Sequence, residues 1–416
     1  MIRRWNSIAA DVRSFWSRRG ISIVRLAAVV ICFAAIVRLY KGVRDLLEGT
    51  SQGNIPDVFT DLIPRWFAGL SVYSYSPLAV HPPATYVMLW PFFGWLEATP
   101  ARWLWTALEV AALAWLVLVT VREGGGEERW QRIFLACLPV CTYATKITLS
   151  KGQFVVFLLP MLITAVLLVE RRAAGWKRDS LVFLLLLLTL SKPPIAALFM
   201  WIVLFLPGGA RPIVFVTAVY ALLTLFGLSF STQDLSIVFQ DWQARTSALA
   251  LNEGSTNLHR LLSRWNLGGW IFPASCLVFA LHGWWVHRHR RVDPWLLMGV
   301  TAVVARFWTY HRQYDDLLIV LPAITLFRLA KKTPRDGADV AAALLFSVIV
   351  AGSLVPLSIL SKQLVWGINL SGVLARIWVV MLAFLLWESQ RERLAPAELR
   401  VQGNNEETEL PLQRAI

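Results

Sequence analysis

The chain has 416 residues, of which 57% are hydrophobic and only 16% are charged. Many apolar runs reach or approach the roughly 18 residues that a helix needs to cross a bilayer. A water-soluble enzyme is excluded, because a soluble surface could not cover so much apolar side chain. The net charge of +14 does not indicate nucleic acid, since the basic residues cluster in short loops between apolar runs. The composition predicts an all-α polytopic membrane protein.

The N-terminal residues 1–20 are amphipathic and rich in arginine, which places this end in the cytoplasm by the positive-inside rule. The first predicted span covers residues 21–40, so residues 41–83 lie outside the membrane. Residues 84–97 are apolar but short, and they contain Pro91. They predict a re-entrant or interfacial helix in this first extracytoplasmic loop.

Three spans are predicted next, at about 102–121, 133–150 and 153–169, and the last two form a hairpin with SKGQ at its outer tip. The following apolar run, 181–206, is interrupted by SKPP. Proline removes a backbone donor and disfavours helix in the residue before it. The run therefore predicts two short helices, about 181–190 and 195–206, instead of one span.

A chain reversal at SKPP also restores the charge rule downstream. It places the loop 231–269 outside and the basic stretch 287–291 (HRHRR) inside, where its charge fixes the topology. The chain then makes about twelve crossings with both termini in the cytoplasm. We expect a cytoplasmic N-terminus of residues 1–20, a transmembrane domain of residues 21–388 and a disordered cytoplasmic tail of residues 389–416.

This threading collects polar side chains from separate segments on the outer face. Asp57 and Asp61 lie one helical turn apart in IPDVFTDLIPRWF, and Arg65 follows one turn later. Cations on this face oppose the charge rule, and the phosphate of a lipid-linked ligand would give them charge-assisted hydrogen bonds. The candidate cations for such a phosphate are Lys192, Arg260, Lys151, Arg312 and Arg264.

Each of these features also has a simpler interpretation. The two aspartates are typical of a solvated helix start, since acids favour the first turn of a helix. Lys192, beside two prolines, is typical of a side chain that snorkels to the membrane interface. His81, His259 and His311 show no ligand spacing that would indicate a metal, so no metal site is predicted.

Several short motifs follow one another in the order DVFTDLIPRWFAGLSVY, HPPATYVMLWPF, KGQFVVFLLP, LSKPP, NEGSTNLHRLL and YHRQYDDLLIVLPA. Over residues 20–330 the chain resembles the bacterial glycosyltransferases of family 87, which depend on polyprenyl-phosphate sugars and have the GT-C fold. The family often has Tyr-Pro-Pro where this chain has His81-Pro82-Pro83. The resemblance implies a GT-C-like bundle in the bacterial inner membrane, with an extracytoplasmic active site.

The resemblance also implies the reaction. Members transfer a sugar, often mannose, from a polyprenyl-phosphate donor to a lipid-linked or glycan acceptor, so the expected partners are this donor, this acceptor and membrane lipids, without nucleic acid or a required cofactor. By position, Asp57 is the expected general base and Asp61 is the alternative. His311 is a candidate second acid/base or a ligand for the phosphate or the acceptor. Inversion at the anomeric carbon is expected. The side chains expected to bind sugar or acceptor are Asn252, Glu253, Asn257, His259, His81, Tyr310 and Gln153.

Two other classes of function remain open on the sequence. A lipid or glycolipid transporter without chemistry would carry ionisable groups near the midplane and internal repeats. Arg25 and Arg306 are weak signs of the former, and no repeat is visible. A non-catalytic scaffold would leave the cations on the outer face unexplained. Within the glycosyltransferase interpretation, mannose, arabinofuranose and galacturonate all remain candidate sugars.

Overall fold

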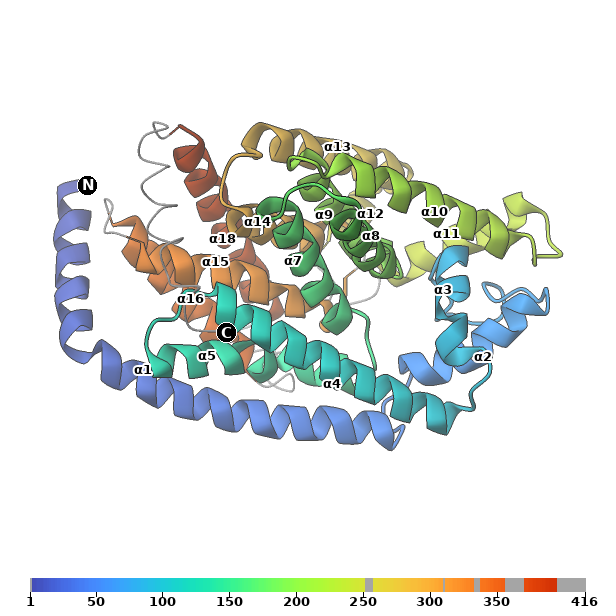
Figure 1. The fold of residues 1–416 in the computed structure, drawn as a ribbon, viewed down its shortest axis with the longest axis horizontal. Coiled ribbons are helices and arrows are strands. Elements are labelled where there is room, and N and C mark those ends of the chain that lie inside the picture. Colours follow the sequence, from blue (N-terminus) through green and yellow to red (C-terminus); the bar gives the residue numbers. More distant parts are fainter. Residues whose placement is uncertain (1, 251–256, 310, 333–336, 356–369, 395–416) are drawn as a thin grey trace.

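The computed structural model describes residues 2–250, 257–309, 311–332, 337–355 and 370–394, and every regular element in them is helical (Figure 1). The prediction of an all-α protein is thereby confirmed. The elements are α1 (Ile2–Leu47), α2 (Ile55–Phe67), α3 (Pro83–Phe93), α4 (Ala98–Glu123), α5 (Arg129–Cys141), α6 (Tyr143–Ser150), α7 (Val155–Arg171), α8 (Trp176–Thr189), α9 (Pro193–Phe205), α10 (Ala210–Leu228), α11 (Leu235–Ala250), α12 (Leu258–Arg264), η1 (Gly268–Trp270), α13 (Ile271–His289), α14 (Pro294–Trp308), η2 (Asp315–Ile319), α15 (Val320–Lys331), α16 (Ala338–Leu354) and α18 (Leu370–Leu394).

Four helical segments in the described ranges are long and apolar enough to cross a membrane: Arg18–Leu47 of α1, α4, α10, and Gly268–His289, which joins η1 to α13. A fifth span results if α5 and α6, which are bent by 49° relative to each other, are counted as one. The apolar helices α9, α14 and α16 are shorter. The protein is thus a multi-pass membrane protein, whereas the number of about twelve crossings stays a prediction.

The predicted interruption at SKPP is confirmed. α8 ends at Thr189, and α9 begins at Pro193 directly after Lys192. The guanidinium of Arg178, at the start of α8, donates a 2.7 Å hydrogen bond to the carbonyl of Gly208, just past the end of α9. The start of one helix therefore lies beside the end of the other, so the chain reverses at the prolines instead of continuing through.

The segment between the first two predicted spans also forms short helices, as expected for residues 84–97. α2 and α3 pack against each other at one end of the molecule (Figure 1). Their contact is aromatic: the rings of Trp66 and Tyr86 stack 5.1 Å apart, and those of Phe59 and Phe93 lie 5.9 Å apart. The N-terminal segment differs from expectation, because α1 runs as one helix from Ile2 through the predicted boundary at residue 20.

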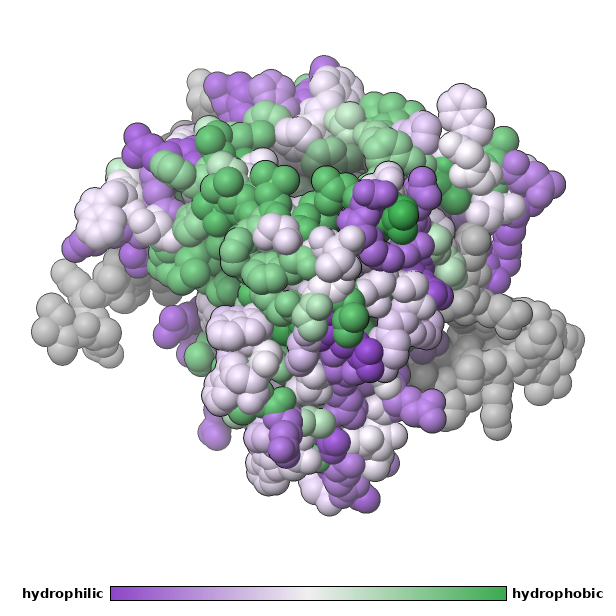
Figure 2. All heavy atoms as spheres, turned by 90° about the vertical axis from the view of Figure 1, so that its right-hand side faces the viewer, coloured by the Kyte–Doolittle hydropathy of each residue, from purple (hydrophilic) through white to green (hydrophobic). Residues whose placement is uncertain are grey.

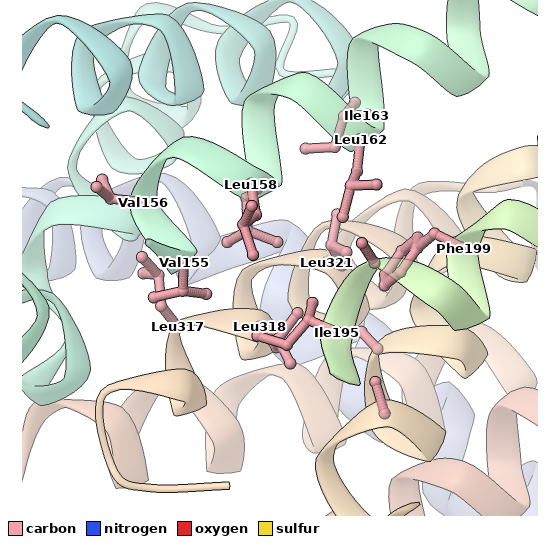
Figure 3. Packing of buried hydrophobic residues seen from close by; sticks show 14 of the residues in the cluster. Val155, Val156, Leu158, Leu162, Ile163, Ile195, Phe199, Leu317, Leu318 and Leu321 are labelled. Carbon is pink, nitrogen blue, oxygen red and sulfur yellow. The ribbon is translucent and has the colours of Figure 1, made fainter. Parts of the chain in front are cut away.

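The core that positions the site is formed by α7, α9 and the η2–α15 segment. Figure 3 shows their apolar side chains interdigitating, with Leu158 of α7, Ile195 of α9 and Leu318 of η2 all fully or almost fully buried. Close packing of this kind fixes the relative positions of helices, since side chains in a dense core have few alternative arrangements. The segments that lead into α7, α9 and η2 are consequently held in place, and these segments carry the polar residues described next.

Candidate functional site

The residues predicted for the outer face lie at or next to helix ends: the first turns of α2, the stretch before α3, the α6–α7 and α8–α9 turns, α12 and the loop before η2. Figure 2 looks onto the end of the molecule that holds α2 and α3 and shows a broad hydrophobic area with hydrophilic side chains around it. Large apolar side chains such as Leu70, Trp265 and Trp270 are more than half exposed in the structure. An apolar surface with polar groups between its parts suits a lipid-linked molecule, whose chain stays in the membrane while its head group is polar.

Asp57 is held in the first turn of α2 by two neighbours. The side chain of Asn54 caps the helix by accepting from the backbone N–H of Asp57 at 3.0 Å, and its amide donates to Asp57 Oδ2 at 2.7 Å. Arg102, from the first turns of α4, forms an ion pair with Asp57 Oδ1 at 2.8 Å. The Asp57 side chain is still 35% exposed. Each carboxylate oxygen has a second lone pair, so the fixed side chain can also accept from a ligand.

Asp61 has a different environment, although it lies only one turn further along α2. It is 47% exposed and pairs with Arg65 at 2.9 Å on the same helix. The Arg65 guanidinium lies over the ring of Tyr75, 3.8 Å from its centroid. Arg65 thus pairs with Asp61, but an exposed pair at this spacing contributes only about 0.3–0.5 kcal/mol. The structure ties Asp57, and not Asp61, to another segment of the fold.

The SKGQ tip between α6 and α7 packs directly on the start of α2. The Lys151 carbonyl accepts from the Ile55 N–H at 2.9 Å, and its ammonium donates to the Gln52 carbonyl at 2.9 Å. Burial lowers the pKa of Lys151, and the nearby positive charges of Arg312 and Lys146 lower it further. Two further cations, Arg312 and Lys146, therefore lie near Lys151, and Lys146 is itself paired with Asp45 at 2.6 Å.

The next residues of this tip extend the contact toward α4. The carbonyl of Gly152 accepts from the indole N–H of Trp105 at 2.8 Å. Gly152 has a positive φ of 60°, and an added Cβ would press against Trp105 and Pro56, so only glycine fits this turn. Gln153 follows it and is only 7% exposed. The tip is thus a rigid turn that links the Asp57 helix to the start of α7.

Lys192 lies at the SKPP turn, almost fully buried, where its ammonium pairs with Asp315 Oδ1 and lies 4.7 Å from the ring centroid of Tyr314. The Tyr314 carbonyl accepts from the hydroxyl of Thr148 at 2.9 Å, which connects this group to the α6–α7 hairpin. Lys192 is therefore not a snorkelling side chain. It is a buried cation at the junction of three helices.

His81 lies close to this group. Its ring packs against Phe59 and Phe154, with centroid distances of 5.2 Å and 5.4 Å. Burial lowers the pKa of His81 to about 4, and the positive charge of Lys192 acts in the same direction. The imidazole is consequently neutral at neutral pH. Because Phe59 belongs to α2, His81 packs against the same helix that carries Asp57.

The loop before η2 carries three further predicted residues, Tyr310, His311 and Arg312. His311 is 1% exposed, and neither ring nitrogen has a hydrogen-bond partner among the described residues. Burial lowers the pKa of His311 to about 3, in spite of the opposing influence of Asp315. The backbone N–H of Arg312 donates to Asp315 Oδ2 at 3.2 Å, so Asp315 binds both this loop and Lys192. Tyr310 lies outside the described residues.

Arg306, one of the two weak transporter signs, is an anchor of the same loop. It pairs with Asp316, and the hydroxyl of Tyr143 donates to the second oxygen of that carboxylate at 2.5 Å. Both charged side chains are largely buried. Arg306 of α14 and Tyr143 of α6 thus both bind the Asp316 carboxylate of η2, and these contacts hold the three elements together. A buried arginine paired in this way does not indicate an ion pathway.

The predicted residues between positions 257 and 264 lie on or directly before a separate helix, α12, which packs against α13 and α14. Asn257 caps it by accepting from the backbone N–H of Arg260 at 2.9 Å, and His259 Nε2 lies 2.9 Å from the hydroxyl of Ser275. Arg264 lies in its last turn. Asn252 and Glu253 lie outside the described residues.

Three residues of the site were missed by the sequence prediction: Asn54, Arg102 and Asp315. Asn54 precedes Pro56 and Asp57, which is a recognisable helix-cap pattern. Arg102 offered no clear local signal, because it lies in the second turn of α4, past the first turn in which a cation would oppose the helix dipole. Asp315 offered only its position on the predicted outer face, because its partner Lys192 is 123 residues away.

The family model of glycosyltransferase family 87 matches residues 79–322. This segment contains His81, Lys192 and Arg312, and it begins after α2, so Asp57 and Asp61 lie outside the matched range. No curated protein and no solved structure matches the chain. The match covers more than half of the chain and agrees with the resemblance of the motifs, and the all-helical architecture is consistent with the GT-C fold. The chain belongs to glycosyltransferase family 87 and is therefore a glycosyltransferase of the membrane.

Proposed function

We propose that this glycosyltransferase moves a sugar, with mannose favoured, from a polyprenyl-phosphate donor to a lipid-linked or glycan acceptor on the extracytoplasmic face of the bacterial inner membrane. Both termini are cytoplasmic, and residues 21–388 form the catalytic domain with about twelve crossings. Asp57 removes the proton of the acceptor hydroxyl. The cations around Lys151 and Lys192 bind the donor phosphate.

The observation that carries this proposal is the pairing of a fixed, partly exposed carboxylate with crowded cations. Asp57 is oriented by Asn54 and Arg102. The backbone of Lys151 is bonded to the same helix start, and the pKa of Lys151 is lowered by burial and by two neighbouring cations. Positive charges held close together in a partly buried site favour the binding of an anion, because the anion reduces their mutual repulsion.

The chemistry of the acceptor requires a base. A sugar hydroxyl is a poor nucleophile, and a carboxylate that takes its proton as the new bond forms supplies general-base catalysis, typically about 10²–10⁴-fold. The ion pair with Arg102 keeps Asp57 in one orientation, so that the free lone pairs face the ligand. A single displacement of this kind inverts the anomeric carbon.

The donor side requires stabilisation of a leaving group. As the bond between the sugar and the phosphate breaks, negative charge grows on the polyprenyl phosphate, and cations already in place stabilise that charge in the transition state. Lys151, Lys192 and Arg312 are the proposed ligands, with Arg260 and Arg264 of α12 at the edge of the site. The N-termini of α7 and α9 add partial positive charge behind Gln153 and Lys192. The scheme uses no metal.

The lowered pKa values support a binding role for both histidines and argue against an acid/base role for His311. His311, with a pKa of about 3, is rarely protonated at neutral pH, so it cannot donate a proton efficiently as a general acid. We propose instead that neutral His311 and His81 hydrogen-bond the sugar or phosphate. Gln153, Asn257, His259, Tyr310, Asn252 and Glu253 are proposed to bind sugar and acceptor hydroxyls.

The experiment that tests the proposed donor compares two classes of sugar donor. Purified full-length protein in nanodiscs is given either polyprenyl-phosphate sugars (mannose, arabinofuranose or galacturonate) or the corresponding nucleotide sugars, with a cell-envelope lipid extract as acceptor. Mass spectrometry should detect glycosylated lipid and free polyprenyl phosphate only with the first class. Transfer from nucleotide sugars alone would overturn the proposed donor.

A further inference from the structure

A second cluster of cations lies away from the candidate active site, where α13 ends. α18 lies at the opposite end of the molecule from α2 and α3 (Figure 1), and its last residues meet the end of α13. Together they line a recess of about 490 Å³. The lining residues are Trp284, His287, Arg288, Arg290, Arg291 and Arg393.

Three arginines at the end of α13 and just past it have no carboxylate partner among the described residues. Within the described part of the chain, Arg288, Arg290 and Arg291 form no ion pair, whereas nearby cations such as Arg391 and Lys332 pair with glutamates of α18. The guanidinium of Arg290 is instead bonded to the carbonyl of His287 at 3.2 Å. At the end of α13 the recess therefore concentrates positive charge that the described carboxylates leave unneutralised.

The recess lies at the level of lipid head groups. α13 belongs to a candidate span, and its side chains Leu277 and Leu281 are 59% and 53% exposed, as expected where a helix faces lipid. Trp284 follows one turn later and is 60% exposed. The guanidinium carbon of Arg288 lies 5.6 Å from the centroid of its ring. An exposed indole between an apolar helix face and arginines marks the membrane interface.

Topology alone does not explain this arrangement. The positive-inside rule requires basic residues in a loop, but it does not require Arg393 to join Arg290 in lining one recess from a helix about a hundred residues later. The C-terminal dipole of α13 favours cations in the last turn, but Arg290 and Arg291 lie past the end of the helix. A ligand with several anionic oxygens would give acceptors to the guanidinium groups of Arg288, Arg290 and Arg291 at once, because arginine binds phosphate in a two-pronged geometry.

We propose that this recess binds the phosphate head group of an anionic phospholipid from the adjoining leaflet, which the charge rule assigns to the cytoplasmic side. The bound phosphate bridges α13 and α18. Basic pockets between membrane helices are known to select anionic head groups, and the exposed face of α13 would contact the acyl chains. The site is distinct from the proposed sugar-transfer site, so neither depends on the other.

The test is native mass spectrometry of the purified full-length protein titrated with dioleoyl phosphatidylglycerol, and separately with dioleoyl phosphatidylcholine. Arg290→Gln/Arg291→Gln is compared with Arg172→Gln/Lys177→Gln, which removes the same charge from two exposed positions, one before α8 and one in its first turn. We expect the first variant to weaken phosphatidylglycerol binding at least tenfold (about 1.4 kcal/mol). The second should change it less than twofold. Equal weakening in both variants would overturn the site, because it would show an effect of overall charge.

Two further measurements complete the test. Arg393→Gln alone should also weaken phosphatidylglycerol binding severalfold, because the site is shared between two helices, and it remains informative if the double variant does not fold. Inorganic phosphate is added as a competitor at millimolar concentration. We expect it to displace little lipid. Displacement of all bound phosphatidylglycerol, or binding of phosphatidylcholine with equal affinity, would overturn the assignment to an anionic lipid.

Discussion

Asp57 and Asp61 are identical side chains one helical turn apart, but they contact different partners and are therefore held to different degrees. Asp57 is bonded to a cap residue and to Arg102 of another helix, whereas Asp61 pairs within its own helix. A contact between segments fixes a side chain relative to the rest of the site. A contact within one exposed helix fixes it only relative to that helix.

Arg102 is therefore expected to act as a positioning residue for Asp57. Arg102→Gln should lower the rate of sugar transfer by up to about 100-fold, the cost of misplacing a reacting group by roughly 1 Å. The Michaelis constant for the donor should change little. Arg65→Gln, which breaks the Asp61 pair, is the matched control and should change the rate less than twofold. Equal effects of both variants on steady-state kinetics would contradict a special role for Arg102.

His311 predicts a pH dependence of stability. Its pKa is about 3 in the folded protein, below the ordinary histidine value of 6.5 that applies to the unfolded chain. The unfolded chain therefore binds more protons between these two values. The contribution of neutral His311 is fully present above pH 6.5 and is lost as the pH falls toward 3. The Tm of the wild type in detergent should fall between pH 6.5 and 4, and the fall should be smaller in His311→Gln. Parallel Tm profiles would show that His311 does not titrate in this way.

At the scale of elements, the Lys192–Asp315 pair joins α9 to η2. Removing one partner of a buried ion pair leaves an uncompensated charge and typically costs about 3–5 kcal/mol. Asp315→Asn and Lys192→Met should each lower the Tm strongly, and the double variant should be more stable than the sum of both effects predicts. Thermal unfolding followed by circular dichroism measures this coupling. Strict additivity would mean that the two side chains do not interact.

The reversal between α8 and α9 can be tested by comparing intact cells, which expose the outer face, with inverted membrane vesicles, which expose the cytoplasmic face. In a Cys276→Ser background, Lys177→Cys lies at the start of α8 and Ala210→Cys at the start of α10, and both positions are exposed. Both should react with a membrane-impermeant thiol reagent only from the cytoplasmic side, whereas Ser74→Cys should react only from outside. Labelling of Lys177→Cys and Ala210→Cys from opposite sides would mean that α8 and α9 form one continuous span.

For the molecule as a whole, the sequence predicted features that depend on local chemistry. The all-helical class follows from the apolar runs, and the turn at SKPP follows from the properties of proline and from the charge rule. The short helix at residues 84–97 was expected for the same kind of reason. Family membership was visible in the order of short motifs, and the family model confirms it for residues 79–322.

Features that depend on contacts between distant segments could not be predicted. Asp315 is the partner of Lys192 from 123 residues away, and nothing in either motif indicates the other. Arg102 reaches Asp57 only because α4 packs beside α2. The number of membrane crossings is equally difficult to predict from the sequence. Helices such as α9 and α14 are shorter than a usual span and must be supported by neighbouring helices.

The most direct test of the central claim is the rate of sugar transfer from the active polyprenyl-phosphate donor by purified Asp57→Asn and Asp61→Asn proteins. Asparagine keeps the shape of each side chain and one acceptor oxygen, but it carries no negative charge and cannot take a proton. The account predicts a loss of about 10²–10⁴-fold for Asp57→Asn and less than a tenfold loss for Asp61→Asn, with both variants folded. Turnover of Asp57→Asn at the wild-type rate would contradict it.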